Sequence, residues 1–469
     1  MLLVRVSSIF LLSFLSHVVY ADDSINENDY PANRIIARDV LIIGGGSGGT
    51  YSAIRLQQQG KSVVVVEKEA VLGGHTNTYI DPVTGAPIDY GVQVWENIPV
   101  VTNYFSYLGV PLTTVNENLS PFVNDVADFS TGTVLPESSL PPTNLAAAIQ
   151  GYAAQLAKYP YLDDGFDLPS PVPDDLLLQF GDFLNKYQLQ ALASLAFEYV
   201  EGVGNMLAQL TLYVMKYLNS EVIAGIASGF LTTASHDNHQ LYDRALSVLG
   251  ADALLNSTPV IVGRDGGGIR AVVSTPSGLM LVKATKLLVA IPPKLENLGF
   301  LDLDDNERDV FSRFNNSYYW TSIVRNSGVP DNTSISAVSF TAPDGVPAMP
   351  GIYEISATGV PGLHSVFYGS TYDIPANQVK SNILSLIAKV VKAAGFPPAS
   401  GPASVVAFQD HSPFELVVSA DEINSGFYDR ANALQGNQGT YWTGAAWQAH
   451  DSSLIWNFTE YNVLPKIIN

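Results

Sequence analysis

Cysteine is absent from all 469 residues of the chain. Its absence excludes disulfide bonds, thiolate metal ligands and a cysteine nucleophile. The chain is long enough for two or three domains, and at this length a hydrophobic core alone can stabilise the fold. We therefore expect a protein that depends on its core and not on covalent cross-links.

Positive charge is also scarce. The chain has 23 lysine and arginine residues against 44 aspartate and glutamate residues, which gives a net charge of -21. Such a surface repels phosphate backbones, so nucleic acid is excluded as an expected partner. The acidic residues are scattered and not collected in runs, which is typical of a solvated surface.

Long apolar runs are confined to the N-terminus. Residues 1–21 contain one basic residue, Arg5, then an apolar stretch, then the small residue Ala21. The stretch is too short to cross a bilayer, so we expect a secretory signal peptide and no stable membrane insertion after its removal. Glycosylation sequons begin at five asparagines and favour a glycosylated protein that is secreted or held in the secretory-pathway lumen: Asn118, Asn256, Asn315, Asn332 and Asn457.

Glycine, in contrast, is concentrated near the start of the chain, in "DVLIIGGGSGGTYSAIRLQQQG". Residues 39–43 are an apolar run of strand length, residues 47–59 have a helical pattern, and residues 62–67 form a second β-branched run. This order predicts a βαβ unit.

The glycines have the spacing that a dinucleotide requires. Gly44 permits the turn out of the strand, Gly46 lets the backbone approach a pyrophosphate, and Gly49 lets helix and strand pack closely. The N-H groups at the helix start then face the phosphates. Glu67 ends the second strand, where a carboxylate can accept hydrogen bonds from ribose hydroxyls. The motif predicts a bound dinucleotide but does not separate NAD from FAD.

The rest of the chain contains both helical and strand patterns. Residues 100–235 include two helical patterns, "LLLQFGDFLNKYQLQALASLAFEYV" at 176–200 and "MLAQLTLYVMKYL". Residues 259–293 show three strands. The glycines at 266–268 lie between two strands with no helix after them, which indicates a hairpin turn and not a second phosphate site. The residues from 440 to the end predict a short strand, a glycine turn and a helix.

Four further segments distinguish FAD from NAD as the expected cofactor. Gly73-Gly74 follows Glu67, "IDYGVQVW" comes next, and "VAIPP" and "TYWTGAAW" occur later in the chain. This order resembles the flavin amine oxidase and phytoene desaturase superfamily. Within it, "LGGHTNTYIDPVTGAPIDYGVQVW" and "LQGNQGTYWTGAAWQAHDSSLIWNFT" are similar to the fungal β-cyclopiazonate dehydrogenase family.

The resemblance implies an α/β fold in which a Rossmann-type FAD-binding domain is built from discontinuous segments, residues 38–99, 236–295 and 431–469. It implies an α+β substrate domain from residues 100–235 and 296–430, in an amine-oxidase-like architecture. The cofactor is then FAD. The implied cofactor-binding residues are Gly44, Gly46, Ser47, Gly49, Glu67, Gly73, Gly74, His75, Thr76, Asp89, Tyr90, Gly91, Val92, Val260, Thr443, Gly444 and Ala445.

Two departures from the superfamily bear on the chemistry. Amine oxidases usually carry a glutamate after the glycine of the last turn, where this chain has Ala445. They also use a lysine near the flavin, yet this chain has no lysine between Lys294 and Lys380, and Arg325 is the nearby cation of comparable reach. Plain amine oxidation is therefore the weaker alternative.

The candidate catalytic side chains are Arg325, His450 and Tyr441. His450 and Asp451 could handle protons together, although Asp451 as a helix cap is the more common arrangement. His75 could either tether the flavin or touch phosphate as a spacing residue, and the second role is preferred. "SHDNH", at 235–239, fits a loop or helix cap better than a metal site, and no metal is expected.

The glycine motif predicts a dinucleotide enzyme, and the resemblance implies an FAD-dependent oxidoreductase of fungal secondary metabolism. We expect it to take a hydride from a small, largely apolar metabolite, with molecular oxygen or another acceptor reoxidising the flavin. The alternatives are a redox-neutral isomerase of an unsaturated substrate and an amine oxidase. A monooxygenase is disfavoured because no second nucleotide motif is present, and a binding protein that has lost its flavin is disfavoured by the intact glycine motif.

Overall fold

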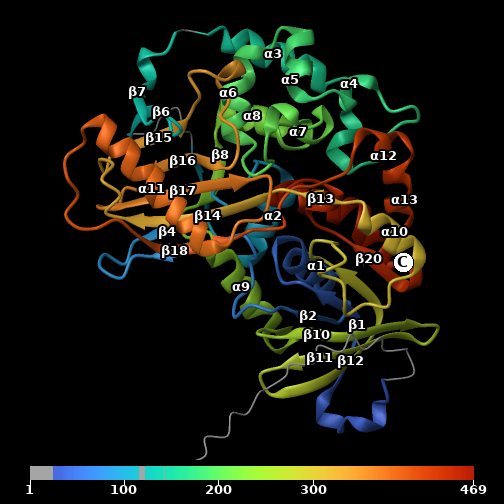
Figure 1. Cartoon of the computed structure of the whole chain (residues 1–469). Coiled ribbons are helices and arrows are strands. Elements are labelled where there is room, and N and C mark those ends of the chain that lie inside the picture. The colour runs from blue at the N-terminus through green and yellow to red at the C-terminus, as the bar shows by residue number, and fades with distance from the viewer. Residues whose placement is uncertain (1–24, 116–121, 142) are drawn as a thin grey trace, which may run out of the picture.

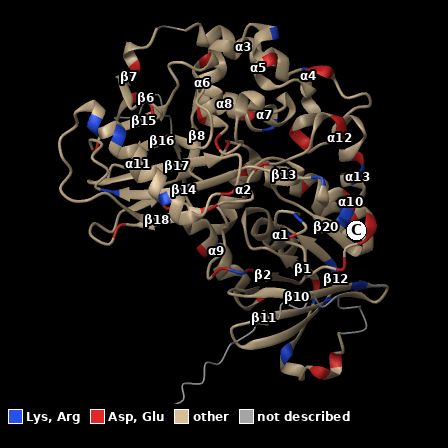
Figure 2. Ribbon diagram, viewed as in Figure 1, with Lys and Arg blue, Asp and Glu red and all other residues tan. Residues whose placement is uncertain are grey.

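The computed structural model describes residues 25–115, 122–141 and 143–469 (Figure 1). The predicted signal peptide and the sequon at Asn118 lie outside the described residues. Within the described ranges, no helix is both long and apolar enough to cross a membrane. Charged residues of both signs are scattered along the ribbon in Figure 2.

A seven-stranded sheet forms the lower part of the molecule in Figure 1. Its centre is β1 (Ile35–Ile43), which pairs in parallel with β2 (Val63–Val66) on one side and with β12 (Gly278–Val289) on the other. All four valines of β2 are buried, as expected for a parallel strand that is covered on both faces. The strand order β10-β11-β12-β1-β2-β9 is completed by β9 (Ala253–Leu254) and by β20 beside β12.

The long strand β12 has different partners along its length. Its first part pairs antiparallel with β11 (Gly268–Thr275), and Leu287, Leu288 and Val289 pair in parallel with β20 (Thr440–Trp442). β10 (Thr258–Asp265) pairs antiparallel with β11, which confirms the predicted hairpin at residues 266–268. The strand near the end of the chain therefore lies in the same sheet as the first strand.

Helices cover this sheet. The predicted helix at residues 47–59 is confirmed as α1 (Ser47–Gln58), which packs against α9 (Gln240–Leu249) and α14 (Ser452–Phe458). A π-helical turn, Thr459–Val463, leads from α14 into α15 (Leu464–Ile468).

A second seven-stranded sheet, at the upper left in Figure 1, has the order β18-β14-β17-β16-β15-β6-β7. It is antiparallel except where β15 pairs with β6. Its strands are β6 (Val123–Asp128), β7 (Thr133–Pro136), β14 (Tyr318–Arg325), β15 (Thr333–Ala337), β16 (Gly351–Ala357), β17 (Leu363–Ser370) and β18 (Ser404–Asp410).

The helix α11 (Ala376–Ala394) packs against this sheet. Its buried residues Val379, Ile383, Ile387 and Val390 recur every three or four positions, so they form one apolar stripe. Gly395, with φ +66°, ends the helix in the left-handed conformation.

The helical region at the top of Figure 1 is broken into shorter pieces than its sequence pattern predicts. Between α5 (Phe180–Tyr187) and α6 (Ala193–Tyr199), Gln188 adopts φ +57° and ends the first helix. The other short elements of the upper part are α3 (Leu145–Leu156), α4 (Asp174–Leu177), α7 (Thr211–Tyr217), α8 (Ser220–Ser228), α10 (Asp305–Ser312), α12 (Ala420–Asn424), α13 (Phe427–Ala433), β13 (Asn315–Asn316) and β19 (Leu416–Val417).

The two parts are joined by segments that follow the glycine motif. The hairpin of β3 (Thr78–Ile80) and β4 (Pro87–Asp89) belongs by sequence to the predicted FAD-binding segment 38–99, yet Ile88 and Tyr90 pack in a cluster with Ile323 and Leu363 of the second sheet. After α2 (Pro99–Leu108), β5 (Leu112–Val115) pairs with β8 (Phe230–Thr233). The segment that carries the second glycine pair thus continues to the upper sheet.

Candidate FAD site

The connection from β1 into α1 requires glycine at two positions, Gly44 and Gly49. Gly44 has φ +100°, a conformation that favours glycine, and a Cβ atom added to Gly49 would lie 1.9 Å from the Gly44 carbonyl oxygen. No side-chain cap covers the start of α1 at Gly46. The free N-H groups of this helix start are available to an anionic group.

Glu67 is fixed at the end of β2. It exposes 8 % of its surface, its Oε2 accepts a hydrogen bond from Gly45 N at 2.6 Å, and its Oε1 accepts one from Glu69 N at 2.8 Å. The Glu67 backbone is bonded on both sides: its N-H donates to the Leu254 carbonyl at 2.9 Å, and the Ser257 N-H donates to the Glu67 carbonyl at 2.8 Å. Val260, predicted to meet the adenine, lies further along β10 at a β-bulge and exposes 49 % of its surface.

The second glycine pair lies against the first. Gly73 N donates to the Gly45 carbonyl at 2.8 Å, and Gly73 and Gly74 both have positive φ. A Cβ atom on Gly74 would lie 3.0 Å from the Cα of Gly46. The two glycine segments therefore form one surface of bare backbone.

Four polar side chains border this surface. The hydroxyls of Ser47 and Ser452 are 2.8 Å apart, and Thr76, Ser47 and Ser452 lie close enough to the Tyr242 hydroxyl to lower its pKa against the larger effect of burial. The buried Thr76 Oγ1 and Tyr242 hydroxyl have no hydrogen-bond partner among the described residues. Buried polar atoms without partners are expected where a bound group supplies the partners. The bare backbone, the hydroxyls and Glu67 together fit FAD.

The turn at residues 443–445 leaves free space beside its backbone. Thr443 N donates to the Val289 carbonyl at 3.1 Å, and its hydroxyl lies 2.6 Å from that of Thr459. Gly444 has φ +111°, and a Cβ atom added there would meet nothing within 4 Å. Ala445 begins the short helical turn Ala445–Trp447. The turn thus presents backbone to open space, as the predicted flavin contact requires.

The segment predicted to approach the isoalloxazine lies beside His75. A Cβ atom on Gly91 would be 1.9 Å from the His75 carbonyl oxygen, and Val92 N donates to that oxygen at 3.0 Å. Asp89 accepts from Thr78 Oγ1 at 2.5 Å and from Asn238 N at 3.0 Å, and its burial raises its pKa to about 7. Asp89 therefore ties the hairpin to the loop before α9.

Three imidazoles and a phenyl ring stack where the upper and lower parts meet. The His75 ring lies 4.1 Å from that of His411 and 5.9 Å from that of His450, and the Phe414 ring lies 3.9 Å from that of His450. We call these four residues the imidazole cluster. Burial lowers the pKa of His75 to about 4 and of His450 to about 3, and it also lowers the pKa of His411 well below its usual value. At neutral pH the cluster is uncharged.

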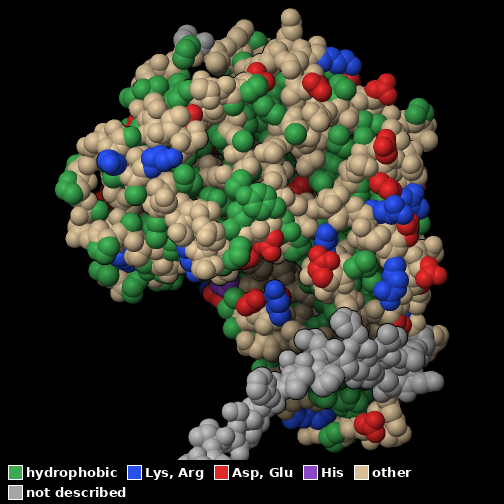
Figure 3. All heavy atoms as spheres, viewed as in Figure 1, with side chains coloured by type: hydrophobic (Ala, Val, Ile, Leu, Met, Phe, Trp, Pro, Cys, Tyr) green, Lys and Arg blue, Asp and Glu red, His purple; other side chains and the backbone are tan. Residues whose placement is uncertain are grey.

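His411 and Phe414 are absent from the sequence-based site. Both follow β18, which pairs with β14 of the second sheet, and His411 Nε2 lies 2.9 Å from Asn77 Oδ1 in the segment that carries His75. The two roles considered for His75 remain predictions. Figure 3 shows a recess on this side of the molecule between the upper and lower parts, with acidic and basic side chains at its rim.

The helix-cap interpretation of Asp451 is confirmed. Its Oδ1 accepts a hydrogen bond from Leu454 N at 2.9 Å at the start of α14, while His450 Nε2 lies 2.9 Å from the Phe414 carbonyl. The buried Glu96 lies beside Asp451, and burial raises the pKa of both carboxyl groups. His450 and Asp451 thus have separate partners.

The other two catalytic candidates are engaged outside the imidazole cluster. Arg325 forms an ion pair with Asp81 at 2.8 Å, and the Tyr441 hydroxyl donates to the Lys466 carbonyl at 3.0 Å. In the "SHDNH" loop, Asn238 Nδ2 donates to the Val92 and Gln93 carbonyls. Among the described residues, no group of three or more histidine, aspartate and glutamate side chains could hold a metal ion.

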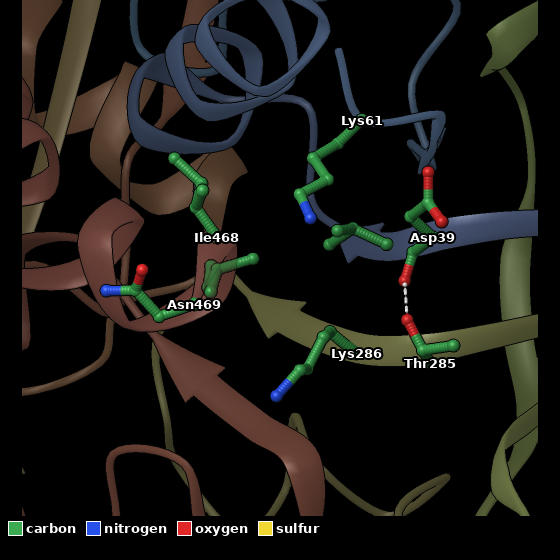
Figure 4. A pocket seen from close by; sticks show the side chains of 8 residues that line it. Asp39, Lys61, Thr285, Lys286, Ile468 and Asn469 are labelled. Carbon is green, nitrogen blue, oxygen red and sulfur yellow. Dashed lines mark hydrogen bonds between the residues drawn. The ribbon is translucent and has the colours of Figure 1, made fainter. Parts of the chain in front are cut away.

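A surface pocket at the outer end of the first sheet is a different feature (Figure 4). It is lined by residues that include Lys61, Lys286 and Asn469, and Thr285 Oγ1 donates to the Asp39 carbonyl at 2.7 Å within it. Its volume of about 120 Å³ is below the range of ordinary cofactor sites. We do not assign FAD to it.

Comparison with known proteins agrees with this geometry. The family described as NAD(P)-binding Rossmann-like domain matches residues 42–108. The chain is similar to FAD-dependent oxidoreductase oblC of Cochliobolus heterostrophus, at 38 % identity over 97 % of this chain and 96 % of the relative. It is also similar to beta-cyclopiazonate dehydrogenase of Aspergillus oryzae, at 34 % identity over 97 % of this chain and 98 % of the relative.

Solved structures share the fold. A fatty acid isomerase from P. acnes that produces CLA aligns with a TM-score of 0.74 at 18 % identity, over 91 % of this chain and 99 % of the isomerase. A redesigned putrescine oxidase aligns with a TM-score of 0.66 at 16 % identity, over 93 % of this chain and all of the oxidase. The amine-oxidase-like α/β architecture is therefore confirmed, and the chain belongs to the fungal β-cyclopiazonate dehydrogenase family of FAD-dependent oxidoreductases.

Proposed function

We propose that this FAD-dependent oxidoreductase removes a hydride from a small, largely apolar secondary metabolite. The observation that carries the proposal is the junction of the cofactor surface with the imidazole cluster. Gly73 and Gly74 border the dinucleotide turn, and the next residue, His75, stacks on His411. A substrate that reaches this junction meets uncharged rings, and neutral rings favour an apolar molecule.

The protein's own part is to bind, orient and exclude water. Bound FAD supplies the two-electron acceptor. The helix start at Gly46, Glu67 and the hydroxyls of Ser47 and Thr76 would hold the dinucleotide, and the turn at Gly444 would present backbone N-H groups to its other end. The amine-oxidase alternative is less well supported because Lys294, at the edge of the lysine-free interval, donates to the Phe314 carbonyl at 2.8 Å.

The first experiment is an absorption spectrum of the purified protein before and after acid precipitation. A yellow protein that releases its colour into the supernatant contains non-covalent FAD, and colour that stays in the pellet indicates a covalent flavin. A colourless protein that stays colourless after incubation with FAD contradicts the proposal and leaves the binding-protein alternative.

The second experiment screens apolar metabolites with an N-H or O-H group for anaerobic bleaching of the flavin. Admission of air should restore the colour with consumption of oxygen if oxygen is the acceptor, which is part of this proposal. Conversion of an unsaturated substrate with neither lasting bleaching nor oxygen uptake would instead establish the isomerase alternative.

Passage through the secretory pathway is a separate part of the proposal. Asn256, Asn315 and Asn332 are exposed, whereas Asn457 is partly buried. We expect glycans at the three exposed positions, because an attached glycan must remain in solvent. Expression of the full chain in a fungal host, followed by peptide mapping with and without glycosidase, tests this. Recovery of unglycosylated protein from the cytosol alone would contradict it.

A further inference from the structure

One buried acid adjoins the imidazole cluster. Glu415 follows Phe414 in the chain and exposes 5 % of its surface. Its backbone is fixed by Ser317, because Glu415 N donates to Ser317 Oγ at 3.1 Å and Ser317 N donates to the Glu415 carbonyl at 3.2 Å. The carboxyl group thus has a defined position beside the cluster.

The groups that face Glu415 come from two helices. Tyr213, Lys216 and Tyr217 of α7 and Tyr428 of α13 all lie close enough to interact electrostatically with its carboxyl group. Of these, the Tyr428 hydroxyl donates to the Tyr213 hydroxyl at 2.8 Å, and the Tyr213 hydroxyl donates to the Val418 carbonyl at 3.3 Å. Both hydroxyl donors are therefore already engaged.

Lys216 is also engaged. Its ammonium group donates to the Leu162 carbonyl at 2.5 Å, to the Gly165 carbonyl at 2.8 Å and to Gln448 Oε1. Gln448 in turn donates to the Asp163 carbonyl at 2.9 Å. Lys216 therefore links the turn at residues 160–165 to the segment after the Gly444 turn. Its three N-H donors are all used, so none is left for a substrate.

Tyr217 differs from these neighbours. It exposes 8 % of its surface, and its hydroxyl lies beside both the Glu415 carboxyl group and the backbone of His450. Despite that proximity, the hydroxyl forms no hydrogen bond of normal geometry with the described residues. A buried hydroxyl without a partner lowers stability, so its retention is most simply explained by a partner that arrives with a ligand.

The proposed oxidation requires an acceptor for a proton. When an H-C-X-H unit, with X nitrogen or oxygen, becomes C=X, a hydride leaves carbon for FAD and a proton leaves X. The histidines of the cluster can accept a proton only at acidic pH, because burial lowers the pKa of His75 to about 4 and of His450 to about 3. A different group is needed near neutral pH.

We propose that Tyr217 and Glu415 are the proton-accepting pair of this reaction, with the Tyr217 hydroxyl contacting the substrate heteroatom and relaying its proton to the Glu415 carboxylate. The inference rests on the proposed function. Burial raises the pKa of Glu415 to about 8, against smaller lowering effects of Tyr217 and Lys216. A base that ionises near the working pH is well matched to proton transfer.

The test needs no substrate, because a carboxyl group near the flavin changes the dependence of the flavin midpoint potential on pH. FAD-loaded protein is titrated with dithionite against redox dyes between pH 6 and pH 10. We expect a change of slope near pH 8 in the wild type, no such change in Glu415→Gln, and the wild-type curve in Tyr152→Phe. Tyr152 is a buried tyrosine of α3 whose hydroxyl donates to the Leu218 carbonyl, so it controls for a general loss of a buried hydroxyl.

A second variant keeps the test decisive if Glu415→Gln does not fold. Because the Tyr217 hydroxyl lowers the pKa of Glu415, Tyr217→Phe should move the change of slope to higher pH. With any substrate found in the anaerobic screen, Tyr217→Phe should slow flavin reduction at least tenfold with little effect on bound FAD. Identical potential curves in the wild type and Tyr217→Phe, together with unchanged reduction, overturn the inference. Failure to bind FAD overturns the proposed function instead.

Discussion

At the scale of single residues, the dinucleotide turn depends on positions where any side chain collides with backbone. In Gly49→Ala, the new methyl group would meet the Gly44 carbonyl oxygen at 1.9 Å, and backbone cannot yield as a flexible side chain can. We expect a loss of about 1–3 kcal/mol in unfolding free energy, as for overpacked sites, and loss of FAD binding, measured by urea unfolding and by retention of the flavin absorbance. Gly299→Ala is the control, since its added methyl group meets nothing within 4 Å. Equal behaviour of the two variants would contradict the role of Gly49.

The raised pKa of Asp89 predicts how the stability of the folded protein changes with pH. Its pKa is raised from 3.8 to about 7 in the folded state, so the folded protein binds its proton more tightly than the unfolded chain does. The contribution of this group to stability is therefore complete below pH 3.8 and is lost as the pH rises to about 7. In Asp89→Asn, which keeps an acceptor for Thr78 and Asn238, stability should fall less steeply over that window. Asp89→Ala leaves both donors unpaired and should lose about 1–3 kcal/mol. Unfolding measured at several pH values distinguishes the variants, and an unchanged slope in Asp89→Asn would contradict the assignment.

Residues with a local signature were predictable, and residues assembled by tertiary contacts were not. Gly44, Gly49 and Glu67 act through neighbours in one βαβ unit, so their spacing alone indicates their roles. His411 and Glu415 meet partners that are distant in sequence, namely His75 for the first and side chains of α7 for the second. Lys216 carried a signal that was missed: it is a charge inside an apolar helix, where all seven residues of α7 are buried.

At the scale of elements, a buried ion cluster joins β10 to α10. Arg264 binds both oxygens of Glu307, at 2.6 and 2.7 Å, and Asp302 Oδ1 at 2.7 Å, and the side chains of Arg264 and Glu307 are fully buried. Arg264→Met should destabilise the protein by about 3–5 kcal/mol, because it leaves a buried carboxylate without its partner. The control is Arg313→Met, whose ion pair with Asp309 is exposed at 44 and 43 %, so its loss should have a much smaller effect on stability. Thermal unfolding of both variants at one pH gives the comparison, and a small effect in Arg264→Met would show that the cluster relaxes.

The boundaries of helices and strands were also predictable only where a residue type marks them. The long apolar stretch from 176 to 200 has a helical pattern, but the left-handed conformation of Gln188 divides it into α5 and α6. Glutamine seldom adopts this conformation, so no residue type marked the break. The hairpin at residues 266–268, in contrast, was predictable because glycines separate two strand patterns.

At the scale of the whole molecule, FAD should act as a stabiliser of the complete fold. The residues of its site come from β1, β2, the segment at 73–76 and the turn at Gly444, so unfolding of any of them releases the cofactor. Ligand at one hundred times its Kd stabilises a protein by about 2.7 kcal/mol. We expect the Tm of the flavin-free protein to rise as FAD is added, followed by differential scanning calorimetry, and the Tm of Gly49→Ala to remain unchanged. A wild-type Tm that does not respond to FAD would contradict this site.

The pairing of β20 with β12 also determines when the nascent chain can bind its cofactor. During synthesis, β1, α1 and β2 with their glycine turn emerge well before the strand beside Val289 and the turn at Gly444. One edge of β12 therefore stays unpaired until β20 has left the ribosome. A ribosome-bound chain that stops before residue 440 should be unable to retain FAD.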